Sequence, residues 1–111
     1  MAWGQGLGEE HPRVLACMDS LSRKLDLYRS VGDVADHVDH AVRIAGIDHV
    51  GLGSDFDGVG KGLPNGLRSA ADYPNLIAEL LRRGYSRDDM AKIAGRNLLR
   101  VWRRNEALAA D

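Results

Sequence analysis

Apolar residues recur at steps of three and four in the first half of the chain, the spacing that lines up one face of a helix. One such stretch runs from Val14 to Tyr28, and a second follows Asp33 and ends at Gly46. Asp33 suits the cap of the second helix, and Gly46 suits its end. Both helices need a partner surface to cover their apolar faces, which comprise Val14, Leu15, Met18, Leu21, Leu25 and Tyr28 in the first and Val34, Val38, Ala41, Val42 and Ala45 in the second.

Three shorter helices are predicted in the last third of the chain. Their ends are marked by residue types with known preferences for helix termini. The first of these helices has Pro74 in its first turn and Gly84 at its end. The second begins with a capping box of Ser86 and Asp89 and ends at Gly95. The third is capped by Asn97.

Between these two groups of helices the pattern changes to alternation. Val50 and Leu52 alternate with Gly51 and Gly53, which predicts a short strand, and the glycine- and proline-rich residues 55–65 predict a loop at its carboxyl end. One strand cannot form a sheet, because its backbone groups need neighbours on both sides. The chain is therefore predicted to be a fragment, or a piece that pairs with another chain.

Composition sets limits on the class of protein. The chain has 111 residues, 44% of them hydrophobic and 28% charged, with a formal net charge of -1. It is too short for a whole barrel enzyme, and its charge gives no field that would attract nucleic acid or anionic lipid. Cys17 is the only cysteine, and no apolar run reaches the ~20 residues that span a bilayer. Without a signal-peptide pattern at the N-terminus, we expect a cytoplasmic protein with no membrane or nucleic-acid partner.

Two carboxylates, Asp55 and Asp57, follow the predicted strand within residues 53–58. A helix-loop-helix calcium site is excluded, because its twelfth position would be Gly66 where a glutamate is needed. A phosphate loop is excluded as well, since residues 60–62 lack the required Ser or Thr. Residue chemistry alone favours an Asx-type turn in which the carboxylates accept backbone hydrogen bonds. The alternative is catalysis, with a carboxylate at the end of a barrel strand carrying protons or binding a substrate amine.

Histidines are the other candidates for chemistry. His37 and His40 lie three residues apart on one side of the second helix, beside Asp36 and Asp39. Metal ligation at that spacing is possible, but the pair lies opposite the apolar stripe, which favours a solvated face. His49 falls within the strand pattern and is interpreted as a packed residue, so no second cluster completes a metal site.

Several ordered blocks closely resemble the end of the membrane dipeptidase (renal dipeptidase, peptidase M19) family. They are residues 33–40, 45–58, 63–67, 73–76, 79–86 and 95–102. The resemblance implies an α/β protein whose residues 31–105 form the C-terminal part of a (β/α)8 TIM-like barrel, with Val50–Gly53 as strand eight. As an isolated chain it is expected to be mostly helical. Residues 1–30 would be an unmatched loop and amphipathic helix, and residues 106–111 a tail.

The same resemblance implies hydrolysis of dipeptides by two zinc ions. Asp55 matches the aspartate assigned to proton transfer and to the substrate's amino group, and Asp57 is a second substrate-binding candidate. The metal ligands of the family lie upstream of the matching region and have no counterpart here, so no residue of this chain is assigned to metal. We therefore expect a zinc dipeptidase segment that is inactive alone.

Two other interpretations stay open. One is a non-catalytic helical module, derived from the barrel, that self-associates as a homodimer. The other is a split enzyme, in which a separate chain supplies the N-terminal strands of the barrel.

Overall fold

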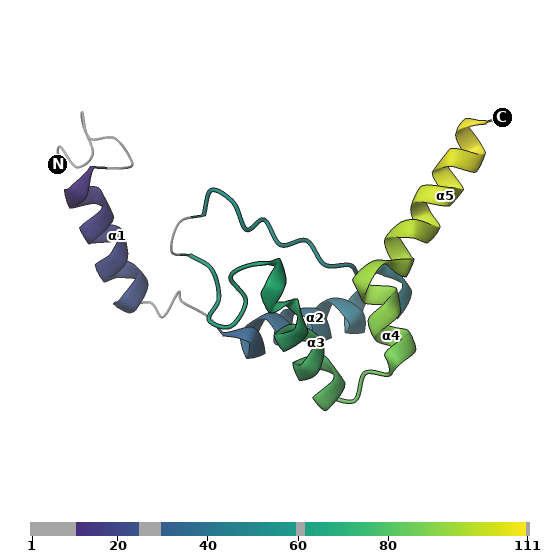
Figure 1. The fold of residues 1–111 in the computed structure, drawn as a ribbon, viewed down its shortest axis with the longest axis horizontal. Helices are drawn as coiled ribbons and strands as arrows, with labels where there is room; N and C mark the ends of the chain where they lie inside the picture. Colours follow the sequence, from purple (N-terminus) through teal and green to yellow (C-terminus); the bar gives the residue numbers. More distant parts are fainter. Residues whose placement is uncertain (1–10, 25–29, 60–61, 111) are drawn as a thin grey trace.

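The computed structural model of the protein describes residues 11–24, 30–59 and 62–110. The helices are α1 (Pro12–Lys24), α2 (Val31–Ala45), α3 (Tyr73–Arg82), α4 (Arg87–Ala91) and α5 (Asn97–Ala109), joined by the short helical turns η1 (Ile47–His49), η2 (Ala70–Asp72) and η3 (Lys92–Arg96). Within the described ranges no residue belongs to a strand, and the expectation of a mostly helical chain is confirmed. In Figure 1, α2, α3 and α4 gather together while α1 stands apart and α5 projects outward.

The core forms where α2 and α3 pack against each other. Leu76 and Leu80, one turn apart on α3, are 1% and 0% exposed, and Ala35 of α2 is 0% exposed. Ile93 of η3 closes the same cluster at 1% exposed, which ties the C-terminal helices to α2 and α3. The buried residues of this cluster are Ala35, Val38, Leu67, Leu76, Leu80, Met90 and Ile93. The buried side chains of α2 and α3 thus cover each other, whereas Ala45, at the end of the apolar face predicted for α2, is exposed.

The start of α2 differs from the sequence prediction. The cap is Ser30, which has extended backbone (φ -104°, ψ 172°), and Asp33 is the third residue of the helix. The Asp33 carboxylate accepts hydrogen bonds from the Ser30 backbone N–H at 2.9 Å and from its hydroxyl at 3.0 Å. A carboxylate in the first turn also faces the positive end of the helix dipole, so Asp33 stabilises the terminus from inside the helix. Gly46, at φ 88°, ends α2 as predicted.

The junction of α4 and α5 contains both a confirmed prediction and a wrong one. Ser86 and Asp89 form the expected capping box, and Gly95 has non-helical backbone that redirects the chain. Asn97, however, does not cap α5. It lies in the first turn of a helix whose preceding residue, Arg96, is already helical (φ -61°, ψ -36°), so no extended residue is available to act as a cap.

The predicted strand Val50–Gly53 is extended but unpaired. Val50 has strand-like backbone (φ -112°, ψ 140°), and Leu52 is half-buried against the core. Among the described residues, none of 51–57 makes a backbone–backbone hydrogen bond. The strand prediction fails because pairing needs a neighbouring strand, which the described part of the chain does not supply. In Figure 1 this segment runs as an open trace between the end of α2 and the loop before α3.

Two helices present apolar side chains to solvent. On α1, Leu15, Met18 and Leu21 are at least half exposed, and the rest of the helix predicted to reach Tyr28 lies outside the described residues. On α5 the exposed apolar residues are Leu98, Leu99, Val101, Trp102 and Leu108. Helix α5 continues to Ala109, so the first residues of the expected tail are helical. No helix in the described ranges has both the length and the apolar character needed to cross a membrane.

Truncation of a core leucine tests this packing. We expect Leu80→Ala to lower the free energy of unfolding by about 2–5 kcal/mol, because it leaves a cavity at a site with no exposed surface. Leu98→Ala makes the same chemical change at a side chain that is 65% exposed. It should change the free energy of unfolding by less than about 0.5 kcal/mol. Urea denaturation followed by circular dichroism measures both; equal losses would contradict the assignment of the core.

Candidate functional site

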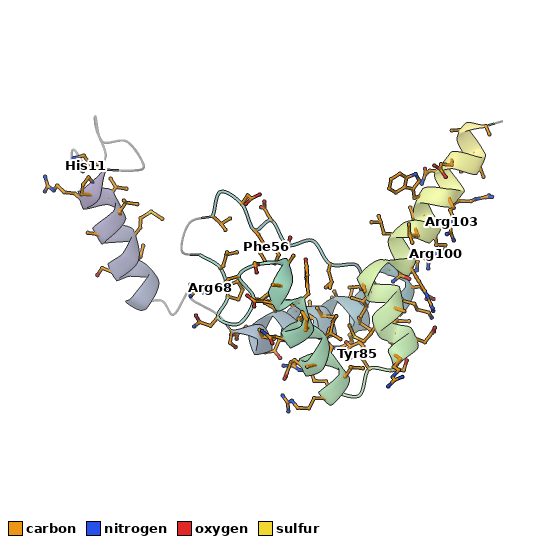
Figure 2. The ribbon with its side chains drawn as sticks, viewed as in Figure 1. His11, Phe56, Arg68, Tyr85, Arg100 and Arg103 are labelled. Atoms are coloured by element: carbon orange, nitrogen blue, oxygen red, sulfur yellow. The ribbon has the colours of Figure 1, made fainter. Side chains whose placement is uncertain are left out.

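The candidate site lies where the extended segment ends. Phe56 is half-buried, and its ring packs against Tyr73 at the start of α3, with centroids 5.7 Å apart and planes inclined by 57°. Its neighbours Asp55 and Asp57 are both exposed. Figure 2 shows Phe56 among the side chains between this segment and α3. The aromatic ring therefore fixes the segment to the core and leaves the two carboxylates at the surface.

Asp55 has an unusual backbone. Its φ of 47° places it in the left-handed region, which Asp tolerates better than most residues other than glycine. Within the described ranges, no hydrogen-bond donor contacts the carboxylate of Asp55 or Asp57. The Asx-type turn favoured by residue chemistry is therefore not formed by the described residues, because none of their backbone N–H groups donates to either side chain. Both carboxylates are open to a ligand.

A small apolar cavity lies beside Phe56. It has a volume of about 190 Å³, and its lining includes Val34, Leu52, Phe56, Leu67, Tyr73 and Leu76. No charged side chain lines it, so it offers nothing to the charged ends of a dipeptide. The cavity belongs to the packing around Phe56 and Leu52.

The histidines do not assemble into a metal centre in the part of the chain that is described. His37, His40 and His49 are exposed, and no three His, Cys, Asp or Glu side chains converge there in a group able to hold a metal ion. The solvated face predicted for His37 and His40 agrees with their exposure. His49, interpreted from sequence as a packed residue, is instead exposed in the turn η1.

A cluster that sequence reasoning missed joins α2 to the end of α3. The Arg83 guanidinium donates to Asp36 at 2.7 Å, to Asp39 at 2.6 Å and to Glu79 at 2.9 Å. It also donates to the backbone carbonyl of Gly32 at 3.0 Å. These five residues and Tyr85 are called the Arg83 cluster below. The i, i+3 spacing of Asp36 and Asp39 was visible in the sequence, but their shared partner lies more than forty residues away.

The protonation states of the Arg83 cluster fit a structural role. The Tyr85 hydroxyl donates to Asp39 at 2.7 Å, and this bond, followed by the Arg83 guanidinium, lowers the pKa of Asp39. Burial, followed by the same bond, raises the pKa of Tyr85 to about 12. Hydrogen bonds from Arg82 and then Arg83 lower the pKa of Glu79. These carboxylates are therefore ionised at neutral pH and paired with donors, an arrangement that holds helices together and leaves none of them suited to proton transfer.

Comparison with known proteins places the chain in a family. The sequence profile of the membrane dipeptidase family (Peptidase family M19) matches residues 14–111. Dipeptidase aclJ of Aspergillus oryzae is 53% identical over 72 residues, which are 65% of this chain and 17% of that protein. Dipeptidase tcpJ of Claviceps purpurea is 46% identical over 82 residues, 74% of this chain and 19% of that protein.

A further relative is an uncharacterized dipeptidase of Schizosaccharomyces pombe, 42% identical over 81 residues, 72% of this chain and 19% of that protein. The chain belongs to the membrane dipeptidase family, because the family profile matches most of its length. The matched region spans less than a fifth of each of these relatives. It corresponds to one part of a dipeptidase.

The hydrogen bond between Tyr85 and Asp39 makes stability depend on pH. Because the folded pKa of Asp39 is lowered, its contribution is present above the ordinary value of 3.8 and is lost as pH falls through the folded pKa. We expect Tyr85→Phe to lower the free energy of unfolding by about 1 kcal/mol at pH 6, a value discounted for the partial exposure of Asp39. The difference in free energy between the variant and the native chain should become smaller below pH 4. Urea denaturation at several pH values measures this.

Tyr73→Phe is the matched control, since it also removes one hydroxyl and keeps its ring. A Tyr85→Phe deficit that stayed constant down to pH 2 would show that the hydroxyl acts through something other than ionised Asp39.

Proposed function

We propose that this chain is the C-terminal part of a zinc-dependent dipeptidase with a (β/α)8 barrel. In this proposal Val50–Gly53 is the eighth strand, and α2 and the closing helices lie against its outer face. Membership of the dipeptidase family and the dipeptidase names of the relatives support the reaction class.

The observation that carries the proposal is the unpaired extended segment. Leu52 packs on the core, but the exposed Gly51 and Gly53 leave their backbone groups without backbone partners in the described part of the chain. A helical module complete in itself would not keep strand-like backbone in this state, because unpaired edges cost stability and invite association. Neighbouring barrel strands would complete these hydrogen bonds.

Asp55 is the proposed proton carrier and partner of the substrate's amino group, and Asp57 is the second substrate-binding residue. Their place directly after the extended segment corresponds to the carboxyl end of a barrel strand, where barrel enzymes keep their active sites. Both carboxylates are exposed and accept no hydrogen bond from the described residues, which leaves them available to a substrate amine. The half-buried Phe56 between them limits the movement of this stretch.

The donor set of the described residues does not fit zinc, since no group of three potential ligands exists there. The proposal therefore assigns no metal ligand to these residues, and zinc would be bound by the rest of the parent enzyme. The part of the reaction assigned to this chain is the binding of the substrate amine and the proton transfer by Asp55.

Purified as it stands, the 111-residue chain should bind less than one zinc ion per chain and hydrolyse no dipeptide. Zinc is measured by plasma mass spectrometry after dialysis, and hydrolysis by release of free amino acids from a dipeptide panel. An Asp55→Ala variant is the control for contaminating peptidase. Stoichiometric zinc, with turnover that the variant loses, would overturn the proposal that the chain is inactive alone.

A chimera tests the catalytic assignment directly. Residues 31–105 replace the matching segment of the Aspergillus oryzae dipeptidase, and the chimera should hydrolyse dipeptides. Asp55→Asn should lower its kcat by about a hundredfold or more, because it removes a proton carrier. Asp57→Asn should mainly raise KM, because it removes a contact to the substrate.

Asp88→Asn is the matched control, since this exposed carboxylate is paired with Arg96 at 2.8 Å, away from the extended segment. If Asp55→Asn and Asp88→Asn had equal activity, Asp55 would not be the catalytic carboxylate.

The helical interaction module remains the second candidate, because the apolar side chains of α1 and α5 are exposed. Size-exclusion chromatography with light scattering distinguishes the two. A stable dimer that Trp102→Ser converts to a monomer would favour the module.

A further inference from the structure

The first turn of α5 contains a buried polar side chain with an unusual set of partners. Asn97 is only 5% exposed, and its amide nitrogen donates to the backbone carbonyl of Ile47 at 2.8 Å and to that of Val50 at 2.9 Å. The first carbonyl belongs to the first residue of the turn η1, and the second belongs to Val50, which follows the turn and begins the extended segment. One side chain therefore holds the point where the chain leaves the turn.

Arg100, one turn further along α5, completes this arrangement. Its guanidinium donates to the carbonyl of Asp48 and to the side-chain oxygen of Asn97, the latter at 3.1 Å. We call these two residues the Asn97–Arg100 pair. Lys92 of η3 also binds the Asp48 carboxylate at 3.0 Å. Three side chains from one stretch of the chain thus hold the turn that precedes the extended segment.

The chemistry of the pair requires an amide at position 97. A carboxylate of the same shape would present oxygen to both carbonyls, and an apolar side chain would leave both without a donor. The change of chain direction at Gly95 brings Asn97 to this turn. Helix capping does not explain a buried Asn here, because its side chain bonds to the 47–50 turn and does not cap α5.

The extended segment is held at its start, at Leu52 and beyond its end. At its start the carbonyl of Val50 is held by Asn97, Leu52 packs on the core, and beyond the end the ring of Phe56 packs on Tyr73. The exposed residues of the segment make no backbone–backbone hydrogen bonds among the described residues, so these three contacts determine its direction. Asp55 lies between the last two of them.

We infer that Asn97, together with Arg100, is a positioning residue that sets the location of Asp55 through the extended segment. The catalytic part of this inference rests on the proposed function. The structural part, that the pair orders residues 50–55, holds for the chain whatever reaction it serves.

The first experiment uses the 111-residue chain and nuclear magnetic resonance. In Asn97→Asp, we expect the order parameters of the Gly51 to Ser54 amides to fall below about 0.6, while those of α3 stay near 0.85. Asn105→Asp is the matched control, because Asn105 is an exposed asparagine of the same helix that binds only the carbonyl of Val101. Arg100→Lys is the second variant, for use if Asn97→Asp does not fold, because it keeps the positive charge. It should lower the order parameters of the same amides. Unchanged order in both variants would overturn the inference.

The second experiment asks whether the pair acts through Asp55, using the chimera. Asn97→Asp should lower kcat by about ten- to a hundredfold with little change in KM, since small displacements of a catalytic group cost that much. In an Asp55→Asn background the same change should have no further effect on kcat, whereas a purely structural role would lower it equally in both backgrounds.

An equal loss in both backgrounds would refute positioning. A chimera that is inactive with native Asn97 would instead refute the proposed function, and the resonance experiment would still decide whether Asn97 orders the segment.

Discussion

A β-strand is stable only when neighbouring strands complete its hydrogen bonds, and this constraint governs how the chain is built. Residues 50–53 have the alternation of a strand and Val50 has its backbone, yet the described residues around them provide no backbone partner. Apolar side chains of α1 and α5 also face solvent, and none of the described residues covers them. A chain matching less than a fifth of its relatives would be expected to show such incomplete surfaces.

Helices α2, α3 and α4 form a packed unit beside the extended segment. Leu76, Leu80 and Ile93 form a small, fully buried core, and the Arg83 cluster fixes α2 to α3 at its edge. The carboxylates of that cluster lie against the Arg83 guanidinium, and the pKa values of Asp39 and Glu79 are lowered by their donors. Asp55 and Asp57 differ from them, because neither carboxylate has a hydrogen-bond or ion-pair partner among the described residues. The distinction between structural and candidate catalytic carboxylates therefore follows from their partners.

The Asn97–Arg100 pair connects these two parts of the molecule. It belongs to the helical part, yet it bonds to the carbonyls of the turn and of Val50, where the extended segment begins. Its hydrogen bond holds the start of the extended segment, and the aromatic contact of Phe56 holds the residue between the two carboxylates. In enzymes, such positioning by residues remote from the reacting atoms determines how well a catalytic group performs.

The sequence by itself determined most of the local structure. The end of α2 at Gly46, the first turn of α3 at Pro74 and the capping box at Ser86 follow from residue preferences that act over one helical turn. The family was also readable from ordered blocks of residues. Asp33 and Asn97 were misassigned as caps because both are favoured at caps, and only the path of the preceding backbone decides whether they act as one.

Only the tertiary structure decided which polar groups meet. Arg83 finds Asp36 and Asp39 across more than forty residues, and Asn97 finds Ile47 and Val50 across a similar distance. Neither pairing leaves a periodic signal, because each depends on how helices pack and where the chain bends. The extended segment shows the converse: its residues specify a strand, but hydrogen bonds between strands are long-range, so its pairing depends on neighbours that the local sequence does not encode.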